Sequence, residues 1–542
     1  PMVHAFVRGW RPGRVALVVT GLLLAGLLGV QAAPPRKGPP AKKPGNEPAP
    51  PPALKLTVVA KTADVPEMVK IINDRLDAGW KANKVVPSRY ADDYEFIRRV
   101  SLDVIGRGAT LAEMKQYMKD PPDKRRSLLV ERLLAGEDYP RHWANLWSNW
   151  LLTRSGPFGK GLYKEQMAVW LEDQFAQNKK YHEIVEKLIT AKGKNSDPNN
   201  GAVNFILAHV GEAVPPADRA RYGQFEMVPL TSRITRLFLG TQVQCAQCHD
   251  HPFYSNLKQE HFWGVNAFLR QVVREGNVVM RRQAMPGPLT LKDNPNTNAN
   301  GVVSFEKRNG VVLSTRAKFL ASGEDKDAAG PKLDLSEGAP GRREQLARFV
   351  IEHENFPKAY VNRMWGVFFG RGFSNPVDDF NDNNQPSNPE LLDELAAKIK
   401  HYEYDQKKLI RWICNSNAYN LSCVANKTND KPEHEVLFSR MVMKSLSPEQ
   451  LFESLMVATN AEAADNKKDK AKARQQWLDK LIGGFGDDEG NEVNFNGTVV
   501  QALMMMNGDD INKAITRKDK GTVALAITHN RTPGGVINDL YL

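Results

Sequence analysis

The sequence predicts a mainly α, multi-helical two-domain protein with a small β-rich insert between the helical halves. Apolar residues recur at helical spacing within residues 61–271 and again within 341–542. Over 272–340 the pattern changes to short alternating runs with an Asn-Gly turn signal, which is typical of a β-hairpin. A chain of 542 residues is long enough for two or three domains of ordinary size.

Residues 1–32 have the features of an export signal peptide. Arg8, Arg11 and Arg14 precede an uncharged apolar run, and small residues follow up to Ala32, after which we expect cleavage. The run is shorter than the roughly 20 residues of a typical membrane span. An uncleaved N-terminal membrane anchor is the alternative. We therefore expect an exported protein, periplasmic or at the cell surface, without a transmembrane span after signal cleavage.

Residues 33–60 are dominated by Pro, Ala and Lys, so we expect a disordered tether that buries almost nothing. The formal net charge is +12, and it falls to +9 when the three arginines of the signal are removed. Basic residues are scattered among acidic ones, which predicts a solvated surface and no nucleic-acid partner. An anionic polysaccharide or a membrane surface is the weaker alternative for this charge.

The first helical region, 61–271, is expected to begin at the helix start Asp64-Val65-Pro66-Glu67. A stripe of large apolar residues on one later helix face is expected to pack in the core, with haem lining as the alternative. Its members are Trp143, Leu146, Trp147, Trp150 and Leu151. A helix over 231–239 leads into Cys245–His249, and a helical pattern resumes at Phe262, so this motif is expected at a bend between two helices.

In the β-rich insert, the runs 302–308 and 311–314 flank Asn309-Gly310, a pair that supplies the two positive φ angles of a tight hairpin turn. In the region 341–542, a helix from Pro357 is expected to end at Gly370. Two further helix starts read as capping boxes, Ser387-Asn388-Pro389-Glu390 and Ser447-Pro448-Glu449-Gln450.

Cys245-Ala246-Gln247-Cys248-His249 spells CxxCH, the attachment motif of a c-type haem. Two thiols at this spacing bond to the vinyl groups of one haem, and the following imidazole binds its iron as an axial ligand. The motif therefore predicts covalent haem c on Cys245 and Cys248, with His249 as axial metal ligand. Candidates for the second axial position are Met285, which precedes Pro286-Gly287, and the histidines His251 and His261. A five-coordinate iron without a second axial ligand is the alternative.

Two other uses of these cysteines stay open. Zinc accepts mixed thiolate and imidazole ligands, so a metal site could be built from Cys245, Cys248, His249 and His251. The two thiols could also join Cys414 and Cys423, although the latter pair is nine residues apart. A disulfide between Cys245 and Cys248 is the remaining reading.

A second polar cluster follows the helix expected from Pro357. The acidic residues Asp378, Asp379 and Asp382 lie in a loop with several asparagines, a composition that could hold a cation such as calcium. The loop lacks the EF-hand spacing, and such side chains more often cap helices and turns. Asn362 and Arg363 are candidates to bridge to it, and a structural ion pair is the alternative that we favour. The sequence has no nucleophile elbow, phosphate loop or HExxH motif, so it gives no positive evidence for catalysis.

Long stretches around these motifs resemble a known family. Residues 238–253, including CAQCHDHPF, resemble the signature of the planctomycetal cytochrome-like domain of unknown function, and 95–103 resemble its opening motif. Residues 361–372, 376–380, 386–392 and 501–507 resemble the domain of unknown function that usually follows it. The resemblance implies an exported protein of a planctomycete-like bacterium and assigns no reaction.

Many members of this family resemble fusions with an additional N-terminal cytochrome c domain, whereas this chain has a single CxxCH. The chain begins at Pro1 and ends at Leu542, so we expect a fragment with a truncated C-terminal domain. Two hypotheses follow. The first is an exported c-type haem protein that transfers electrons with a redox partner protein. The second is an exported binding or scaffold protein linked to polysaccharide breakdown, with a structural Cys/His metal site or a disulfide.

Overall fold

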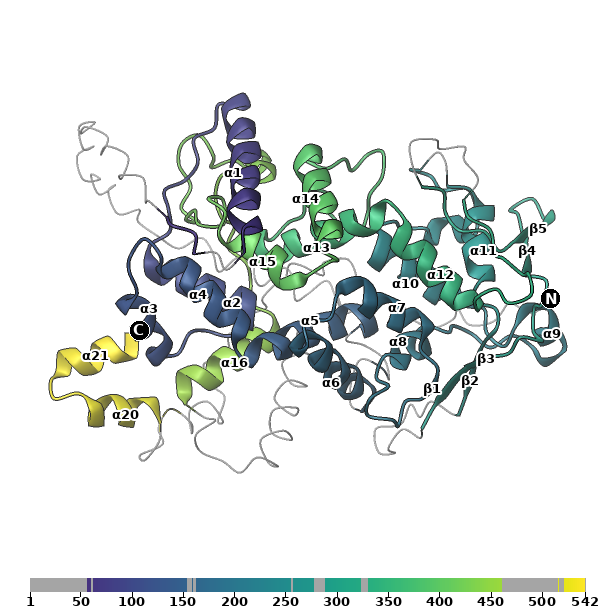
Figure 1. Cartoon of the computed structure of the whole chain (residues 1–542), viewed down its shortest axis with the longest axis horizontal. Helices are drawn as coiled ribbons and strands as arrows, with labels where there is room; N and C mark the ends of the chain where they lie inside the picture. Colours follow the sequence, from purple (N-terminus) through teal and green to yellow (C-terminus); the bar gives the residue numbers. More distant parts are fainter. Residues whose placement is uncertain are drawn as a thin grey trace, which may run out of the picture. The chain divides into compact units, whose positions relative to one another are not determined.

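The structure is a computed structural model that describes residues 56–59, 62–153, 158, 162–254, 257–276, 288–322, 330–460, 515 and 521–541. The predicted signal peptide, most of the predicted tether, Met285 and residues 501–507 lie outside these ranges. The described part is mainly helical with two small sheets, which confirms the predicted fold class (Figure 1). None of its helices is both long enough and apolar enough to span a bilayer.

The helices before the β-rich region are α1 (Asp64–Ala82), α2 (Asp93–Ile105), α3 (Leu111–Lys119), α4 (Arg125–Ala135), α5 (Asp138–Leu152), α6 (Leu162–Ala176), α7 (Tyr181–Thr190), α8 (Val203–Ala208), α9 (Arg219–Tyr222), α10 (Val228–Leu239) and α11 (Gln259–Ala267). Short 3-10 turns lie at η1 (Pro216–Asp218), η2 (Gln244–Gln247) and η3 (Pro432–Leu437). The later helices are α12 (Arg342–Glu352), α13 (Asn355–Phe369), α14 (Pro389–His401), α15 (Gln406–Cys414), α16 (Pro448–Thr459), α20 (Thr522–His529) and α21 (Pro533–Tyr541).

Helix α1 begins at Asp64 as predicted and packs against helices from the other end of the chain. Its apolar face is buried beside α14 and α15 (Figure 1). Asp64, which is 5% exposed, accepts a hydrogen bond from Trp412 Nε1 at 2.9 Å and pairs with Lys408 Nζ at 2.7 Å. The described residues from 56 onward belong to one compact unit, and helices from both predicted halves contribute to its core.

The tryptophan stripe of α5 lies in this core, as predicted. Trp143, Trp147 and Trp150 are each at most 4% exposed. Trp143 lies with its ring centroid 6.2 Å from that of Phe368 in α13. The guanidinium of Arg363, also in α13, lies 5.2 Å from the ring centroid of Trp150, a cation–π contact. Arg363 therefore packs on the stripe.

The predicted β-rich region supplies strands to two small sheets. One sheet has the order β1-β3-β2, from β1 (Gly193–Lys194), β3 (Thr290–Asp293) and β2 (Val272–Glu275), all antiparallel. The other is the hairpin of β4 (Val302–Glu306) and β5 (Val312–Arg316). The strand β1 lies before the CxxCH motif in the sequence. It has only two residues, and so short a strand has no sequence pattern that could predict it.

The hairpin is confirmed, but its predicted turn is wrong. Only Gly310 has a positive φ, at +79°, and its N–H donates to Lys307 O at 2.8 Å. Lys307 N–H then donates to Val311 O at 2.9 Å, which makes a three-residue loop with a glycine bulge. Asn309 keeps an ordinary φ because this loop requires a left-handed residue at one position only.

The predicted helix ends are partly correct. Gly370 closes α13 with φ +79°, and Ser447 forms the expected capping box with Gln450. The predicted box at Ser387 is wrong. Asn388 is the N-cap of α14, and its side chain accepts from Leu391 N–H at 3.1 Å, because an Asn side chain next to Pro389 reaches the free amide equally well.

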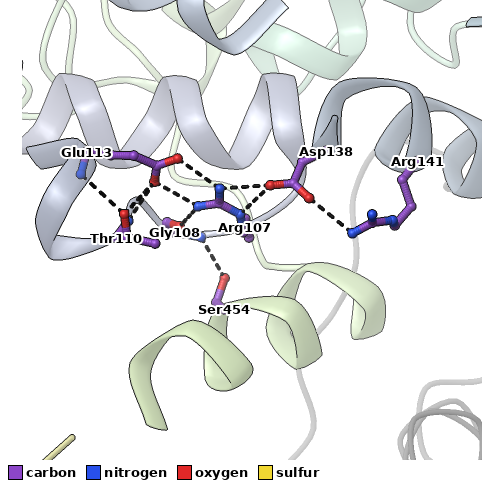
Figure 2. A network of polar contacts seen from close by, with 7 residues as sticks. All are labelled: Arg107, Gly108, Thr110, Glu113, Asp138, Arg141 and Ser454. Atoms are coloured by element: carbon purple, nitrogen blue, oxygen red, sulfur yellow. Dashed lines mark hydrogen bonds and ion pairs between the residues drawn. The ribbon is translucent and has the colours of Figure 1, made fainter. Parts of the chain in front are cut away.

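Buried and half-buried ion pairs join helices that are far apart in the sequence. Figure 2 shows Arg107, between α2 and α3, donating to Glu113 in α3 and to Asp138 at the start of α5. The hydrogen bonds with the Glu113 carboxylate are the main reason why the pKa of Arg107 is raised above its usual value. The neighbouring Gly108 N–H donates to Ser454 Oγ of α16 at 3.1 Å. This loop therefore ties the N-terminal helices to α16.

A second such joint lies at Asp103 in α2, which is 4% exposed. Its carboxylate accepts hydrogen bonds from Lys444 Nζ at 2.6 Å and from Tyr419 Oη at 2.8 Å. Lys444 Nζ also donates to the carbonyls of Val367 and Phe368, at 2.8 and 3.0 Å, which are free because they end α13. One ammonium group thus joins α2, α13 and the segment before α16.

We predict that Asp103→Asn lowers the free energy of unfolding by about 3 kcal/mol, because Lys444 then keeps a buried charge without its counter-ion. The control is Asp74→Asn, which removes the exposed pair with Lys70 and should cost less than about 0.5 kcal/mol. Urea denaturation of both variants measures the difference. Equal losses would show that Asp103 and Lys444 are not coupled as a buried pair.

Candidate functional site

The CxxCH motif lies between α10 and α11, as predicted. Gly240 ends α10 in a left-handed conformation, with φ +61°, and its N–H donates to Arg236 O at 3.2 Å. The chain then turns into η2, which contains Cys245. Ala246 is fully buried between the two cysteines and anchors the turn in the core.

Both thiols of the motif are exposed, and neither is in a disulfide. Helix α11 holds the turn that carries the two thiols. Gln247 O of this turn accepts hydrogen bonds from Gln259 Nε2 and Trp263 Nε1 of α11, each at 3.1 Å. Exposed sulfurs on an anchored turn are accessible to a large reactant without unfolding of the domain.

His249 follows the second cysteine directly. Its Nδ1 lies 2.7 Å from the carbonyl oxygen of Asp250. A carbonyl only accepts hydrogen bonds, so Nδ1 carries a proton, and in the neutral imidazole Nε2 then has the free lone pair. A metal-binding histidine is held in the same way, with its other ring nitrogen bonded to a carbonyl or carboxylate.

Asp250 and His251 hold the turn around the motif. Asp250 Oδ1 accepts from Gln259 N–H at 3.0 Å, at the first turn of α11. His251 is 9% exposed, and its Nδ1 accepts from Phe253 N–H and Tyr254 N–H, each at 3.2 Å. Burial lowers the pKa of His251, and a hydrogen bond with the backbone of Gln242 opposes this shift. The ring of His251 therefore forms hydrogen bonds with backbone groups of the surrounding turn.

The other predicted ligands are placed as follows. Met285 lies outside the described residues. His261 is at the start of α11, where its Nδ1 accepts from Lys258 N–H at 3.1 Å, and it lines a cleft of about 600 Å³ together with Tyr254 and Phe380.

The cysteine-based metal sites are not assembled in the part of the chain that the structure describes. No three His, Cys, Asp or Glu side chains gather there as metal ligands do. Cys414 is 1% exposed in α15, where burial raises the pKa of its thiol. Cys423 N–H donates to Glu95 Oε1 at 2.9 Å, and both thiols are free.

The predicted cation loop contacts the CxxCH segment. Asp378, 2% exposed, pairs with Arg236 of α10 and accepts from Gln242 Nε2 at 3.4 Å. Asp379 Oδ1 accepts from Tyr254 Oη at 3.0 Å, and burial followed by this carboxylate raises the pKa of the Tyr254 hydroxyl. Two of the three acidic residues are thus engaged by the segment 236–254, and Asp382 lies in the wall of the cleft.

Backbone contacts complete this docking. Phe380 N–H donates to Gly240 O at 2.7 Å, and a Cβ on Gly240 would lie 3.0 Å from the Phe380 ring. Asn362, fully buried, holds the start of the loop by donating to Ser374 O and Val377 O, each at 3.0 Å. Asn362 therefore bridges to the loop, as was considered from the sequence.

Sequence reasoning missed Arg236, Gln242, Gln259 and Trp263 as residues that support the motif. The one sequence feature that could have singled out Arg236 is its place as an arginine in the last turn of a helix, beside the apolar residues Leu237 and Phe238. Its partner is 142 positions away along the chain, so no local pattern could identify it.

We predict that Gly240→Ala lowers the free energy of unfolding by about 1–3 kcal/mol, because alanine is strained at a left-handed φ and its Cβ presses on Phe380. The control is Gly79→Ala in α1, where no atom lies within 4 Å of the added Cβ and φ is ordinary. It should raise stability by about 0.5–1 kcal/mol. Denaturant titrations that give the same sign for both would contradict the docking of Phe380 on Gly240.

Comparison with known proteins gives two family matches. Residues 71–274 match the family model described as PSCyt2, a protein of unknown function (DUF1549). Residues 342–493 match PSD1, a protein of unknown function (DUF1553). Among curated proteins and solved structures, no match was found. The two matches confirm the recognised order of family regions: this chain carries a PSCyt2 region followed by a PSD1 region, and both are of unknown function.

Proposed function

We propose that the protein is an exported carrier of one covalent c-type haem that exchanges electrons with a redox partner protein. Cys245 and Cys248 would hold the haem, and His249 would bind its iron through Nε2. One observation carries the proposal. Two exposed, free thiols lie on an anchored turn, followed at once by an imidazole whose Nδ1 is held by a backbone carbonyl. The name of the PSCyt2 family, which covers this segment, is in line with a cytochrome-like role.

The residues present fit the group chemically. Exposed thiols can form thioether bonds to the vinyl groups of a haem, which would supply one-electron redox chemistry at its iron when bound. His249 donates from Nδ1 to Asp250 O, and this hydrogen bond fixes the ring and raises the basicity of Nε2. Asp250 and His251 hold the turn, so they position His249.

Export is part of the same proposal. The predicted signal peptide would direct the chain out of the cytoplasm. Covalent attachment of haem c normally takes place outside the cytoplasm. The candidates for a second iron ligand remain Met285, His261 and His251. His261 would first have to give up the amide hydrogen bond that its Nδ1 accepts from Lys258. His251 would first have to give up the two amide hydrogen bonds that its Nδ1 accepts.

The alternative from the sequence, a scaffold with a structural cysteine site, requires a disulfide or a gathered ligand set. The four cysteines are free, and the described residues contain no cluster of three candidate ligands. A link to polysaccharide has no contact that favours it, so we do not advance it as a second function.

We predict that the full chain, made in a host with a haem-attachment system, carries about one covalent haem per molecule. A pyridine haemochrome spectrum measures this, and metal analysis of the same sample should find no stoichiometric zinc. The double variant Cys245→Ala, Cys248→Ala should lose the covalent chromophore. The matched control Cys414→Ala, Cys423→Ala should keep it. A wild-type protein without covalent chromophore and with one zinc per chain would overturn the proposal.

A further inference from the structure

The β4–β5 hairpin packs along α11, the helix that holds the CxxCH turn (Figure 1). Just after β5, Lys318 N–H donates to Gly264 O of α11 at 3.2 Å. The two backbones lie so close there that a Cβ on Gly264 would meet Lys318 O at 2.8 Å. Near the loop end of the hairpin, Phe305 of β4 is 5% exposed and packs on Trp263 of α11. The hairpin is therefore docked on α11 at both of its ends.

Gln259 of α11 joins this hairpin to the CxxCH turn. The residue is 3% exposed, and its amide nitrogen has two hydrogens to donate. Nε2 donates to Glu306 O of β4 at 2.9 Å and to Gln247 O of the turn at 3.1 Å. The Gln259 N–H also donates to Asp250 Oδ1 at 3.0 Å. One residue thus contacts the hairpin and the turn on both sides of His249.

Trp263, one turn further along α11, makes the same connection through a second pair of contacts. Its ring is nearly parallel to that of Phe305 in β4, at 6° and with the ring centroids 6.4 Å apart. Its Nε1–H donates to Gln247 O at 3.1 Å. A carbonyl oxygen has two lone pairs, so Gln247 O can accept from both side chains. Two side chains that contact the hairpin therefore converge on one carbonyl, which lies between the two cysteines of the motif.

This arrangement makes the conformation of the turn depend on the hairpin. A displacement of β4 would move the acceptor of Gln259 and the ring beneath Trp263, and both changes reach Gln247 O. We propose that the β4–β5 hairpin positions the CxxCH turn for haem, with Gln259 and Trp263 as the positioning residues. The inference rests on the proposed function, because a haem site needs its thiols and its imidazole held in one geometry by surrounding hydrogen bonds.

The first test uses the full chain made without haem attachment. Its readout is hydrogen exchange of the Ala246 amide, which donates to Val243 O inside the turn at 2.9 Å. Gln259→Met keeps the length of the side chain but removes its two amide donors, so this exchange should become about tenfold faster. Trp263→Phe keeps a ring on Phe305 but removes the Nε1–H, and should speed the exchange about threefold.

A change on the hairpin itself shows whether the effect passes through α11 to the turn. Phe305→Leu keeps an apolar side chain beside Trp263 but removes the stacked ring, and should speed the exchange of the Ala246 amide about threefold. The matched control is Val312→Ala on β5, where the side chain is 64% exposed. It should leave this exchange within about twofold of the wild type.

The second readout is the reduction potential of the haem-loaded protein. Gln259→Met and Phe305→Leu should each change this potential, whereas Val312→Ala should not, and a loss of overall stability alone would not move it. Unchanged exchange of the Ala246 amide in both Gln259→Met and Phe305→Leu would overturn the proposal. The exchange is measured without haem, so a chain that takes up no haem refutes the proposed function by a separate result.

Discussion

The structure depends on the docking of the CxxCH segment against the loop 374–384 of the PSD1 region. A buried ion pair between Arg236 and Asp378, a backbone bond between Phe380 and Gly240, and the hydrogen bond from Tyr254 to Asp379 form this contact. Because the carboxylates are buried or half-buried, removal of one partner leaves an uncompensated polar group. The two family regions are therefore joined beside the motif that carries the proposed chemistry.

The same principle recurs at the other joints of the molecule. Asp103 with Lys444, Asp64 with Lys408, and Arg107 with two acidic residues each connect helices distant in sequence. Apolar packing supplies most of the stabilisation of such a core, while hydrogen-bonded ion pairs of this kind fix which helices meet. A rigid frame suits a site whose turn must stay in place while its thiols remain exposed.

Local chemistry made much of this fold predictable from the sequence. The start of α1, the tryptophan face of α5, the hairpin of β4 and β5, and the cap at Ser447 depend on neighbouring residues, and the structure has them. Prediction failed where two local arrangements are both compatible with the residues. Asn388 caps α14 instead of Ser387, and the β4–β5 hairpin has a three-residue loop instead of a two-residue turn. The sequence could not show that Asp378 pairs with Arg236 or that Asp379 accepts from Tyr254. The two residues of each pair are more than a hundred positions apart in the sequence, so no local pattern links them.

The most direct test is a crystal structure of the full chain purified from a host with a haem-attachment system. The account predicts thioether bonds from Cys245 and Cys248, iron bound by His249 Nε2, and Nδ1 still on the carbonyl of Asp250. The contacts of Asp378 with Arg236 and of Asp379 with Tyr254 should be unchanged. Iron held by other residues, or a disulfide between Cys245 and Cys248 with no porphyrin beside it, would contradict it.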